Sequence, residues 1–271
     1  MNDAAQARTR EEEWAERFRF YIEPPTVGAI KAWLELFEEA DRPTAAKALD
    51  HVLIISEREI QRGYRAALET IPGWSADPAV RQGSWFFVGF GRAGESGPAM
   101  VRSFRSANDL ALAKYDGLFC DLSDLPYKKL TASDTVVFID DFSGTGRQVC
   151  RLWPVVSELV ASEAVCHLIL TAATTAAETA IRERTQLISH VSHSLGPDAN
   201  VFDEACTNFD QAEKDTLARY GAIADPRRPR GYGDSGLLLV LSHKTPNNSI
   251  PILHVNEDHW KGLFPRYLRA A

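Results

Sequence analysis

An apolar run, two adjacent acids and a loop of small residues follow one another in Thr135-Val136-Val137-Phe138-Ile139-Asp140-Asp141-Phe142-Ser143-Gly144-Thr145-Gly146-Arg147-Gln148. The run predicts a buried parallel strand, which delivers its last residues to the sheet edge where α/β folds place ligands. Carboxylates at that edge can hold sugar hydroxyls, directly or through a divalent cation. The loop offers backbone N–H groups, hydroxyls and a helix N-terminus, which favour a phosphate. The pattern therefore predicts a ribose-phosphate site.

Three other interpretations of this pattern can be weighed. A P-loop needs a lysine after its last glycine, and Arg147 follows Gly146 here, so that route to triphosphate hydrolysis is disfavoured. Phosphatases of the haloacid-dehalogenase type carry two acids separated by one residue. Asp140 and Asp141 are adjacent and would face opposite ways within a strand. The third alternative is a strand followed by a helix N-cap with no ligand. The joint occurrence of strand, acids and loop favours the ribose-phosphate site.

The same stretch resembles the motif of type I phosphoribosyltransferases, which is an apolar strand, two acids, two variable residues and a glycine loop rich in Thr and Ser. The resemblance implies that Asp140 and Asp141 are catalytic and hold the ribose hydroxyls of phosphoribosyl pyrophosphate. It also implies Mg²⁺ held through the ribose and pyrophosphate oxygens of this substrate, with Asp140 and Asp141 as candidate contacts, and not in a protein-only cage. Gly144 and Gln148 depart from the family pattern, in which hydroxyl residues are usual at both positions. The ribose-phosphate site predicted in this way comprises Asp140, Asp141, Phe142, Ser143, Gly144, Thr145, Gly146, Arg147 and Gln148.

A second junction of strand, loop and helix lies earlier in the chain, near residues 85–98. Its glycines allow a ligand to approach the backbone, and Arg92 can make bidentate contacts with phosphate oxygens. In phosphoribosyltransferases the loop after an early strand binds pyrophosphate, and the resemblance implies that role here. A glycine-rich turn with a solvent-facing arginine is the alternative. The predicted pyrophosphate site comprises Gly91, Arg92, Ala93, Gly94 and Ser96.

An arginine-rich segment late in the chain is unusual for an acidic protein. Such a loop could close over a polyanionic substrate and exclude water, although a solvated surface turn explains it equally well. The candidate lid comprises Arg227, Arg228, Arg230 and Tyr232. Residues 231–235 and 245–248, taken with the acid motif, resemble phosphoribosyltransferase-like proteins of bacterial conflict and anti-phage systems.

The remaining sequence predicts an α/β fold with a mostly parallel open sheet flanked by helices and an N-terminal helical region. We expect a helical region over residues 1–75 and a phosphoribosyltransferase-like α/β domain over 84–260, packed as one unit. Helices are expected at 9–22, 27–37, 46–68, 98–112, 145–160, 174–185 and 209–220. Strands are expected at 85–90, 118–122, 136–140, 164–171, 187–191, 236–242 and 250–253.

Composition restricts the function classes. The net charge of −7 argues against general nucleic-acid or anionic-membrane binding as the main activity. No apolar run approaches the ~20 residues of a spanning helix, and the N-terminus lacks the order of a signal peptide. A cytoplasmic protein with reduced thiols is expected, because the four cysteines are widely spaced. These are Cys120, Cys150, Cys166 and Cys206.

Three functions compete at this stage. The first is an enzyme that transfers phosphoribose from phosphoribosyl pyrophosphate to an unknown acceptor. The second is a non-catalytic sensor or regulatory subunit for ribose phosphates or nucleotides, which the departures at Gly144 and Gln148 favour. The third is an effector that works only with partner proteins of a bacterial defence operon. Homodimerisation and the role of the N-terminal helices stay open.

Overall fold

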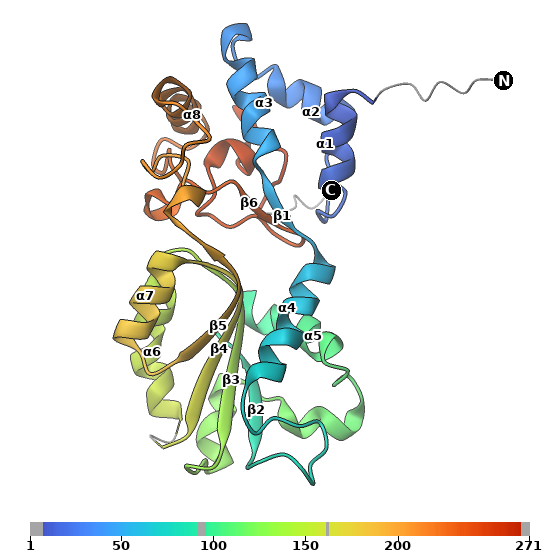
Figure 1. Ribbon diagram of the computed structural model, residues 1–271, viewed down its shortest axis with the longest axis vertical. Coiled ribbons are helices and arrows are strands. Elements are labelled where there is room, and N and C mark those ends of the chain that lie inside the picture. The colour runs from blue at the N-terminus through green and yellow to red at the C-terminus, as the bar shows by residue number, and fades with distance from the viewer. Residues whose placement is uncertain (1–7, 92–95, 161–162, 267–271) are drawn as a thin grey trace, which may run out of the picture. The chain divides into compact units, whose positions relative to one another are not determined.

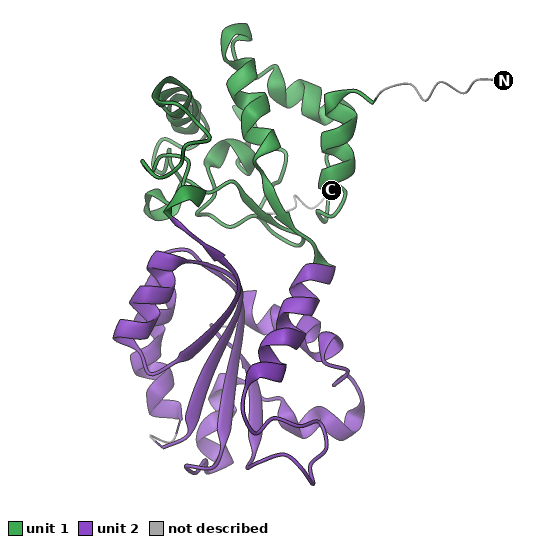
Figure 2. Ribbon diagram, in the orientation of Figure 1, with its two compact units in different colours: residues 1–57, 197–271 green, residues 58–196 purple. Residues whose placement is uncertain are grey.

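The computed structural model describes residues 8–91, 96–160 and 163–266. The chain divides into two compact units, shown in Figure 2. Unit 1 comprises residues 1–57 and 197–271, and unit 2 comprises residues 58–196. The predicted α/β class with a mostly parallel sheet flanked by helices is confirmed. The units cut across the predicted ranges 1–75 and 84–260, because unit 1 combines both ends of the chain.

Unit 2 is built on a four-stranded parallel sheet in the order β2-β3-β4-β5 (Figure 1). The strands are β2 (Trp85–Gly89), β3 (Thr135–Ser143), β4 (Val165–Thr174) and β5 (Ile188–Leu195). Helices α4 (Glu57–Thr70) and α5 (Ser96–Ala107) lie on one side of this sheet, and α6 (Arg147–Leu159) and α7 (Thr175–Arg184) on the other. β3 and β4 are apolar over most of their length because helices cover both faces of the sheet.

Two details of unit 2 differ from expectation. The strand expected at 118–122 is reduced to a single parallel bridge between Phe119 and Phe87, flanked by the 3₁₀ helices η2 (Ala113–Leu118) and η3 (Leu122–Lys128). A capping box between Asp121 and Asp124 starts η3, so local side-chain bonds to the backbone end the strand pairing there. β3 runs beyond its predicted end at Asp140, whereas α6 agrees with the helix predicted over 145–160 and continues through Pro154.

Unit 1 combines the N-terminal helices with the last part of the chain. Its helices are α1 (Arg10–Phe18), α2 (Val27–Leu34), α3 (Arg42–Asp50) and α8 (Gln211–Ala224), with 3₁₀ turns η1 (Glu39–Asp41), η4 (Pro197–Ala199), η5 (Tyr232–Asp234) and η6 (Pro251–Leu253). Its strands are the parallel pair β1 (Leu53–Ile55) and β6 (Leu239–Leu241) and the antiparallel pair β7 (Asn256–Glu257) and β8 (Trp260–Lys261). Aromatic pairs join the two ends of the chain, with Phe18 4.9 Å from Phe264 and Phe37 4.4 Å from Tyr220 between ring centroids. The aromatic side chains of the N-terminal helices are therefore part of the core.

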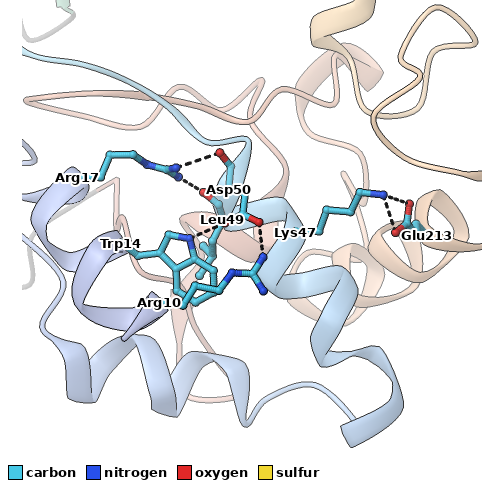
Figure 3. Close-up of polar contacts among 7 residues, drawn as sticks. All are labelled: Arg10, Trp14, Arg17, Lys47, Leu49, Asp50 and Glu213. Carbon is cyan, nitrogen blue, oxygen red and sulfur yellow. Dashed lines mark hydrogen bonds and ion pairs between the residues drawn. The ribbon is translucent and has the colours of Figure 1, made fainter. Parts of the chain in front are cut away.

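Polar contacts hold α3 against α1 and α8 (Figure 3). Asp50 at the end of α3 accepts a hydrogen bond from Trp14 Nε1 at 2.9 Å and forms an ion pair with Arg10. Lys47, also on α3, donates to both carboxylate oxygens of Glu213 on α8, at 2.6 and 2.8 Å. These contacts explain why α8, far along the chain, belongs to the same unit as α1 and α3.

Two expectations for unit 1 are wrong. The single helix predicted over 46–68 is two helices, α3 and α4, because residues 53–55 pair in parallel with residues 239–241. Tertiary pairing of this short apolar run overrides its helical spacing. The strand expected at 250–253 is the 3₁₀ turn η6, which starts with Pro251 in its first turn. The strand expected at 236–242 is shortened to β6.

The thiols and the helix lengths bear on the remaining expectations. All four cysteines are free, and three of them are buried, as the prediction of reduced thiols requires. Across the described ranges, no helix is both long and apolar enough to cross a membrane.

The start of α5 packs closely on the end of β2, and this packing can be tested at Gly97. A Cβ atom there would lie 2.1 Å from the carbonyl oxygen of Phe90 and 2.6 Å from its nitrogen. We expect Gly97→Ala to lower the free energy of unfolding by about 1–3 kcal/mol, because the neighbouring atoms belong to the backbone. Urea denaturation measures this. Gly117→Ala is the control, since a Cβ at Gly117 would have no described atom within 4 Å; equal losses for both variants would contradict the packing argument.

Candidate functional site

The two acids of the motif lie within β3 and beyond the end of its neighbour β2. The β2–β3 ladder ends with Gly89 opposite Ile139, one residue before Asp140. On the other side, β3 stays paired with β4 as far as Ser143. Just after β2, the Phe90 nitrogen donates a hydrogen bond to Ile139 O at 2.8 Å. After Phe90 the chain leaves the sheet. The acids therefore sit at a step in the carboxyl edge of the sheet, which is where open α/β sheets form their crevice.

Asp140 and Asp141 are consecutive residues of β3, and their carboxyl groups lie close enough to interact directly. Asp140 shares its face with Phe138, whose ring contacts Trp153 of α6 at a centroid distance of 6.2 Å. Both acids are buried, with 3% and 6% of their surface exposed.

The structure brings together parts of the two predicted loops. Ser96 Oγ, at the start of α5, donates a hydrogen bond of 2.6 Å to Asp140 Oδ1. Tyr64 of α4 donates to the carbonyl oxygen of Asp140 at 3.2 Å. Gly91 has a φ of +132°, a conformation that favours glycine. Arg92, Ala93 and Gly94, also predicted to bind pyrophosphate, lie outside the described residues.

Burial raises the free-energy cost of ionising the Asp140 carboxyl. The pKa of its carboxyl is raised well above the ordinary value, first by burial and then by the charge of Asp141. Hydrogen bonds from Ser96 and from the nitrogen of Asp141, which lies 2.9 Å from Asp140 Oδ1, oppose the rise without cancelling it. A nearby cation or a developing positive charge would favour the ionised form. A buried acid with such a perturbed pKa at a sheet edge is a functional candidate.

Asp134, just before β3, provides a structural contrast. It is also buried, but its oxygens accept hydrogen bonds from the Ser84 nitrogen at 2.8 Å and from the Thr131 nitrogen at 2.7 Å. Burial alone would raise the pKa of Asp134, whereas these hydrogen bonds hold the pKa below its ordinary value. Folding therefore favours the charged form of the Asp134 carboxyl and disfavours that of the Asp140 carboxyl.

The loop after the acids is fixed by backbone conformation and by the next strand–helix junction. Gly146 has a φ of +67° and is the N-cap of α6; a Cβ there would lie 3.0 Å from the Ala180 Cβ. The carbonyl oxygen of Gly144 accepts a hydrogen bond of 2.7 Å from Thr174 Oγ1, and Thr174 also caps α7. The N-cap residue of α6 makes no side-chain hydrogen bond, and the first N–H of the helix, that of Arg147, donates to Thr145 Oγ1 at 3.4 Å. The first N–H groups of α6 thus border a loop of small residues, an arrangement suited to an anion.

Thr171 is a site residue that sequence reasoning missed. The register pairs Asp140 with Leu170 and Phe142 with Ala172, so Thr171 lies beside Asp141 on the same face of the sheet. Its side chain is fully buried, and Oγ1 has no hydrogen-bond partner among the described residues. The sequence carried no signal for this, because a threonine in an apolar run is an ordinary strand residue.

Two histidines on the same face as Thr171 form a hydrogen-bonded pair. His167 Nδ1 lies 3.0 Å from His190 Nε2, on neighbouring strands β4 and β5. Burial, with a smaller effect of His190, lowers the pKa of His167 to about 4, so this ring is neutral at physiological pH. Across residues 8–91, 96–160 and 163–266, no group of three or more His, Cys, Asp and Glu side chains could hold a metal ion. The two rings contact each other between β4 and β5, with their centroids 5.1 Å apart.

The candidate lid belongs to unit 1, whereas the acid motif belongs to unit 2. Arg228 stacks its guanidinium over the ring of Tyr232, 5.5 Å from the centroid. Arg230 lies over Phe202 at 4.9 Å. Arg227 is exposed, and its nitrogen donates to Asp225 Oδ1 at 3.0 Å. The lid role of these residues stays a prediction.

Comparison with known proteins bears on the strand, acids and loop described above. A family model described as PRTase-CE matches residues 30–266. The chain belongs to this family. The match covers parts of both units and includes the acid motif, so the predicted phosphoribosyltransferase-like family is confirmed and agrees with the parallel sheet of unit 2. A search of curated proteins gives no match.

The raised pKa of Asp140 predicts that its neutral isostere stabilises the fold. Well below pH 4, the ordinary pKa of an aspartate, the acid is protonated in both the folded and the unfolded chain. As the pH rises towards the higher folded-state pKa, ionisation favours the unfolded chain, so wild-type stability falls relative to Asp140→Asn. We expect Asp140→Asn to gain about 0.5–2 kcal/mol at pH 8 and little at about pH 3.5. Urea denaturation at the two pH values measures the difference.

Asp134→Asn is the matched control for this experiment. Its lowered pKa contributes stability that is present above the unfolded-state pKa and lost as the pH falls. We therefore expect Asp134→Asn to destabilise the protein at pH 8. A loss of stability at pH 8 in Asp140→Asn as well would contradict the assignment of Asp140 as an electrostatically unfavourable acid.

The unpartnered hydroxyl of Thr171 predicts a second stabilising substitution. Thr171→Val keeps the shape of the side chain and removes a buried polar atom, so we expect a gain of about 1 kcal/mol in unfolding free energy. Thr185→Val is the control, because Thr185 Oγ1 donates to Ile181 O at 2.7 Å and accepts from Leu187 N at 3.2 Å. Thermal denaturation of the two variants should shift the melting temperature in opposite directions. A loss of stability in Thr171→Val would show that its hydroxyl is satisfied.

Proposed function

We propose that unit 2 binds phosphoribosyl pyrophosphate with Mg²⁺ and transfers its phosphoribosyl group to an acceptor. The observation that carries the proposal is the Ser96–Asp140 hydrogen bond, which joins the start of α5 to the acid motif at a step in the sheet edge. Two loops with different chemistry thus meet beside one buried carboxyl. Membership of the PRTase-CE family supports the same substrate class.

Each part of this edge has a role in the proposal. Asp140 and Asp141 hold the ribose hydroxyls, and residues 143–148 with the first N–H groups of α6 bind the 5′-phosphate. Residues 91–96 bind the pyrophosphate. Because Asp140 Oδ1 already accepts from Ser96 and from the Asp141 nitrogen, a ribose hydroxyl would use Oδ2 or displace Ser96. Displacement of Ser96 would couple binding of the ribose to movement of the pyrophosphate loop.

The acid pair fits a magnesium ion that is held mainly by the substrate. Two neighbouring carboxylates supply only part of an octahedral oxygen shell, and ribose and pyrophosphate oxygens would complete it. The high pKa of Asp140 fits this arrangement, because a bound cation would offset the cost of its charge. When bound, Mg²⁺ supplies positive charge to the departing pyrophosphate.

The reaction exchanges one bond at the anomeric carbon. The bond to pyrophosphate breaks and its electron pair leaves with the pyrophosphate, while a nitrogen of the acceptor forms the new bond and loses a proton. Positive charge develops on the ribose ring in an oxocarbenium-like transition state. Ionised Asp140 and Asp141 favour that charge, and they keep the ring oriented while the bonds change.

A non-catalytic sensor is the second candidate function. The lack of two hydroxyl groups in the loop after the acids favours it. Gly144 contributes a carbonyl oxygen to Thr174 and has no hydroxyl to offer a phosphate, and Gln148 also lacks one. Such a loop holds the 5′-phosphate through backbone N–H groups, which supports binding more directly than turnover. A role in bacterial defence with partner proteins is a further part of the proposal, motivated by the resemblance of residues 231–235 and 245–248.

The two candidates are separated by measuring binding and pyrophosphate release in the same preparation. The protein is incubated with phosphoribosyl pyrophosphate, Mg²⁺ and a panel of nucleobases, alone and after co-expression with the products of neighbouring genes. We expect release to fall at least about 100-fold in Asp140→Asn/Asp141→Asn, because the charges that favour the transition state are removed. Glu158→Gln, an exposed acid of α6, is the control.

The outcomes of this experiment assign the function. Release confined to the co-expressed complex supports the effector, and calorimetric binding without release under any condition supports the sensor. Absence of binding in the wild type, or binding unchanged in the double variant, would overturn the ribose-phosphate site itself.

A further inference from the structure

Unit 1 contains a pocket that the proposed function does not use. Its volume is about 340 Å³, within the range of small-molecule sites, and its lining residues all lie between 225 and 266. The lining includes Arg228 and Gly231 from one late segment and Asn247 from the other. Gly231 and Asn247 belong to the segments that carried the narrower resemblance, and Arg228 belongs to the candidate lid.

The walls of this pocket are held by backbone and side-chain hydrogen bonds. The nitrogen of Tyr232 donates to Asn247 O at 2.7 Å, and Asn248 Nδ2 donates to Tyr232 O at 2.9 Å. Gly231 has a φ of +79°, and a Cβ there would lie 2.5 Å from the carbonyl oxygen of Asn248. Only glycine lets the two segments approach so closely. The pocket is therefore formed before any ligand arrives, which lowers the entropic cost of binding.

The charged groups suit a ligand with a single phosphate. Arg228 and Arg266 line the pocket, and a guanidinium group can bind phosphate oxygens in bidentate fashion. Asp225 and Glu257 line it as well, so the two formal positive charges are balanced by two negative ones. A polyphosphate would meet these carboxylates at an electrostatic cost, whereas a monophosphate with hydroxyl groups can use both kinds of side chain.

The neutral groups suit a heteroaromatic ring. Asn247 and Asn256 can each donate and accept hydrogen bonds, as the edge of a nucleobase requires, and Pro251 and Val255 provide apolar surface. His254 donates through Nε2 to Ser249 O at 3.2 Å. Burial first, and then Arg266, lower the pKa of His254 to about 4, so it presents a neutral ring to the pocket.

We propose that this pocket binds a nucleoside 5′-monophosphate. Arg228 and Arg266 bind the phosphate, the asparagine amides bind the base, and the carboxylates of Asp225 and Glu257 accept from the ribose hydroxyls. The proposal is independent of the reaction in unit 2, because every lining residue belongs to unit 1. It gives the protein a second small-molecule site with its own specificity.

Calorimetric titration of the full-length protein with AMP, GMP, CMP and UMP, without Mg²⁺, tests the proposal. We expect at least one of the four to bind with a dissociation constant below about 1 mM, and inorganic phosphate and the matching nucleoside each to bind at least about tenfold more weakly. Arg228→Gln and Asn247→Asp should each weaken binding at least about tenfold, the first by loss of the guanidinium and the second by an added negative charge.

Two controls keep this site distinct from the ribose-phosphate site. Arg227→Gln removes the neighbouring exposed arginine, which does not line the pocket, and should leave the affinity unchanged. Asp140→Asn/Asp141→Asn should also bind normally. Circular dichroism checks that each variant is folded. The proposal is overturned if none of the four nucleotides binds, if folded Arg228→Gln and Asn247→Asp bind as the wild type does, or if binding disappears in the Asp140/Asp141 double variant.

Discussion

The site in unit 2 depends on a difference in strand length. β2 stops opposite Ile139, whereas β3 and β4 remain paired as far as Ser143 and Ala173. The backbone of β3 beyond Ile139 therefore borders the start of α5 instead of another strand, and Ser96 can reach Asp140. If β2 continued for three more residues, a strand would fill the space in which the two loops meet. The step in the sheet makes the contact between its loops possible.

The two ends of β3 differ in whether they favour the charge of a buried acid. Asp134 lies just before β3. Its carboxylate oxygens accept hydrogen bonds from the neighbouring turns, and these bonds favour its charged form. Asp140 lies at the other end of the strand, covered by protein and next to a second acid, and its charge is opposed. Nearby Thr171 buries a hydroxyl without a partner in the described part of the chain. Unfavourable polar groups are thus concentrated at one end of the sheet, as expected where stability is traded for ligand binding.

The predictable parts of this protein are those governed by local patterns. The run Val136–Ile139 and the glycine loop after it identified β3, the start of α6 and the acids, because a buried strand and a tight helix entry have clear sequence signals. Residues 53–55 looked helical because their partner, residues 239–241, is distant in sequence. Residues 118–122 looked like a strand because their apolar spacing outweighed the capping signal of Asp121. Thr171 and the pocket around His254 depend on register and on contacts between distant segments, which no local pattern reveals.

The division of the chain has a consequence for synthesis. Unit 2 is one continuous segment, whereas unit 1 is made from the two ends of the chain on either side of it. On the ribosome, unit 2 can complete its sheet as soon as residue 196 has emerged. The N-terminal helices must wait until the last residues are translated, because their aromatic side chains pack against Tyr220, Trp260 and Phe264. A prematurely terminated chain would therefore present exposed aromatic surface beside a finished parallel sheet, and it would be a substrate for chaperones and proteases.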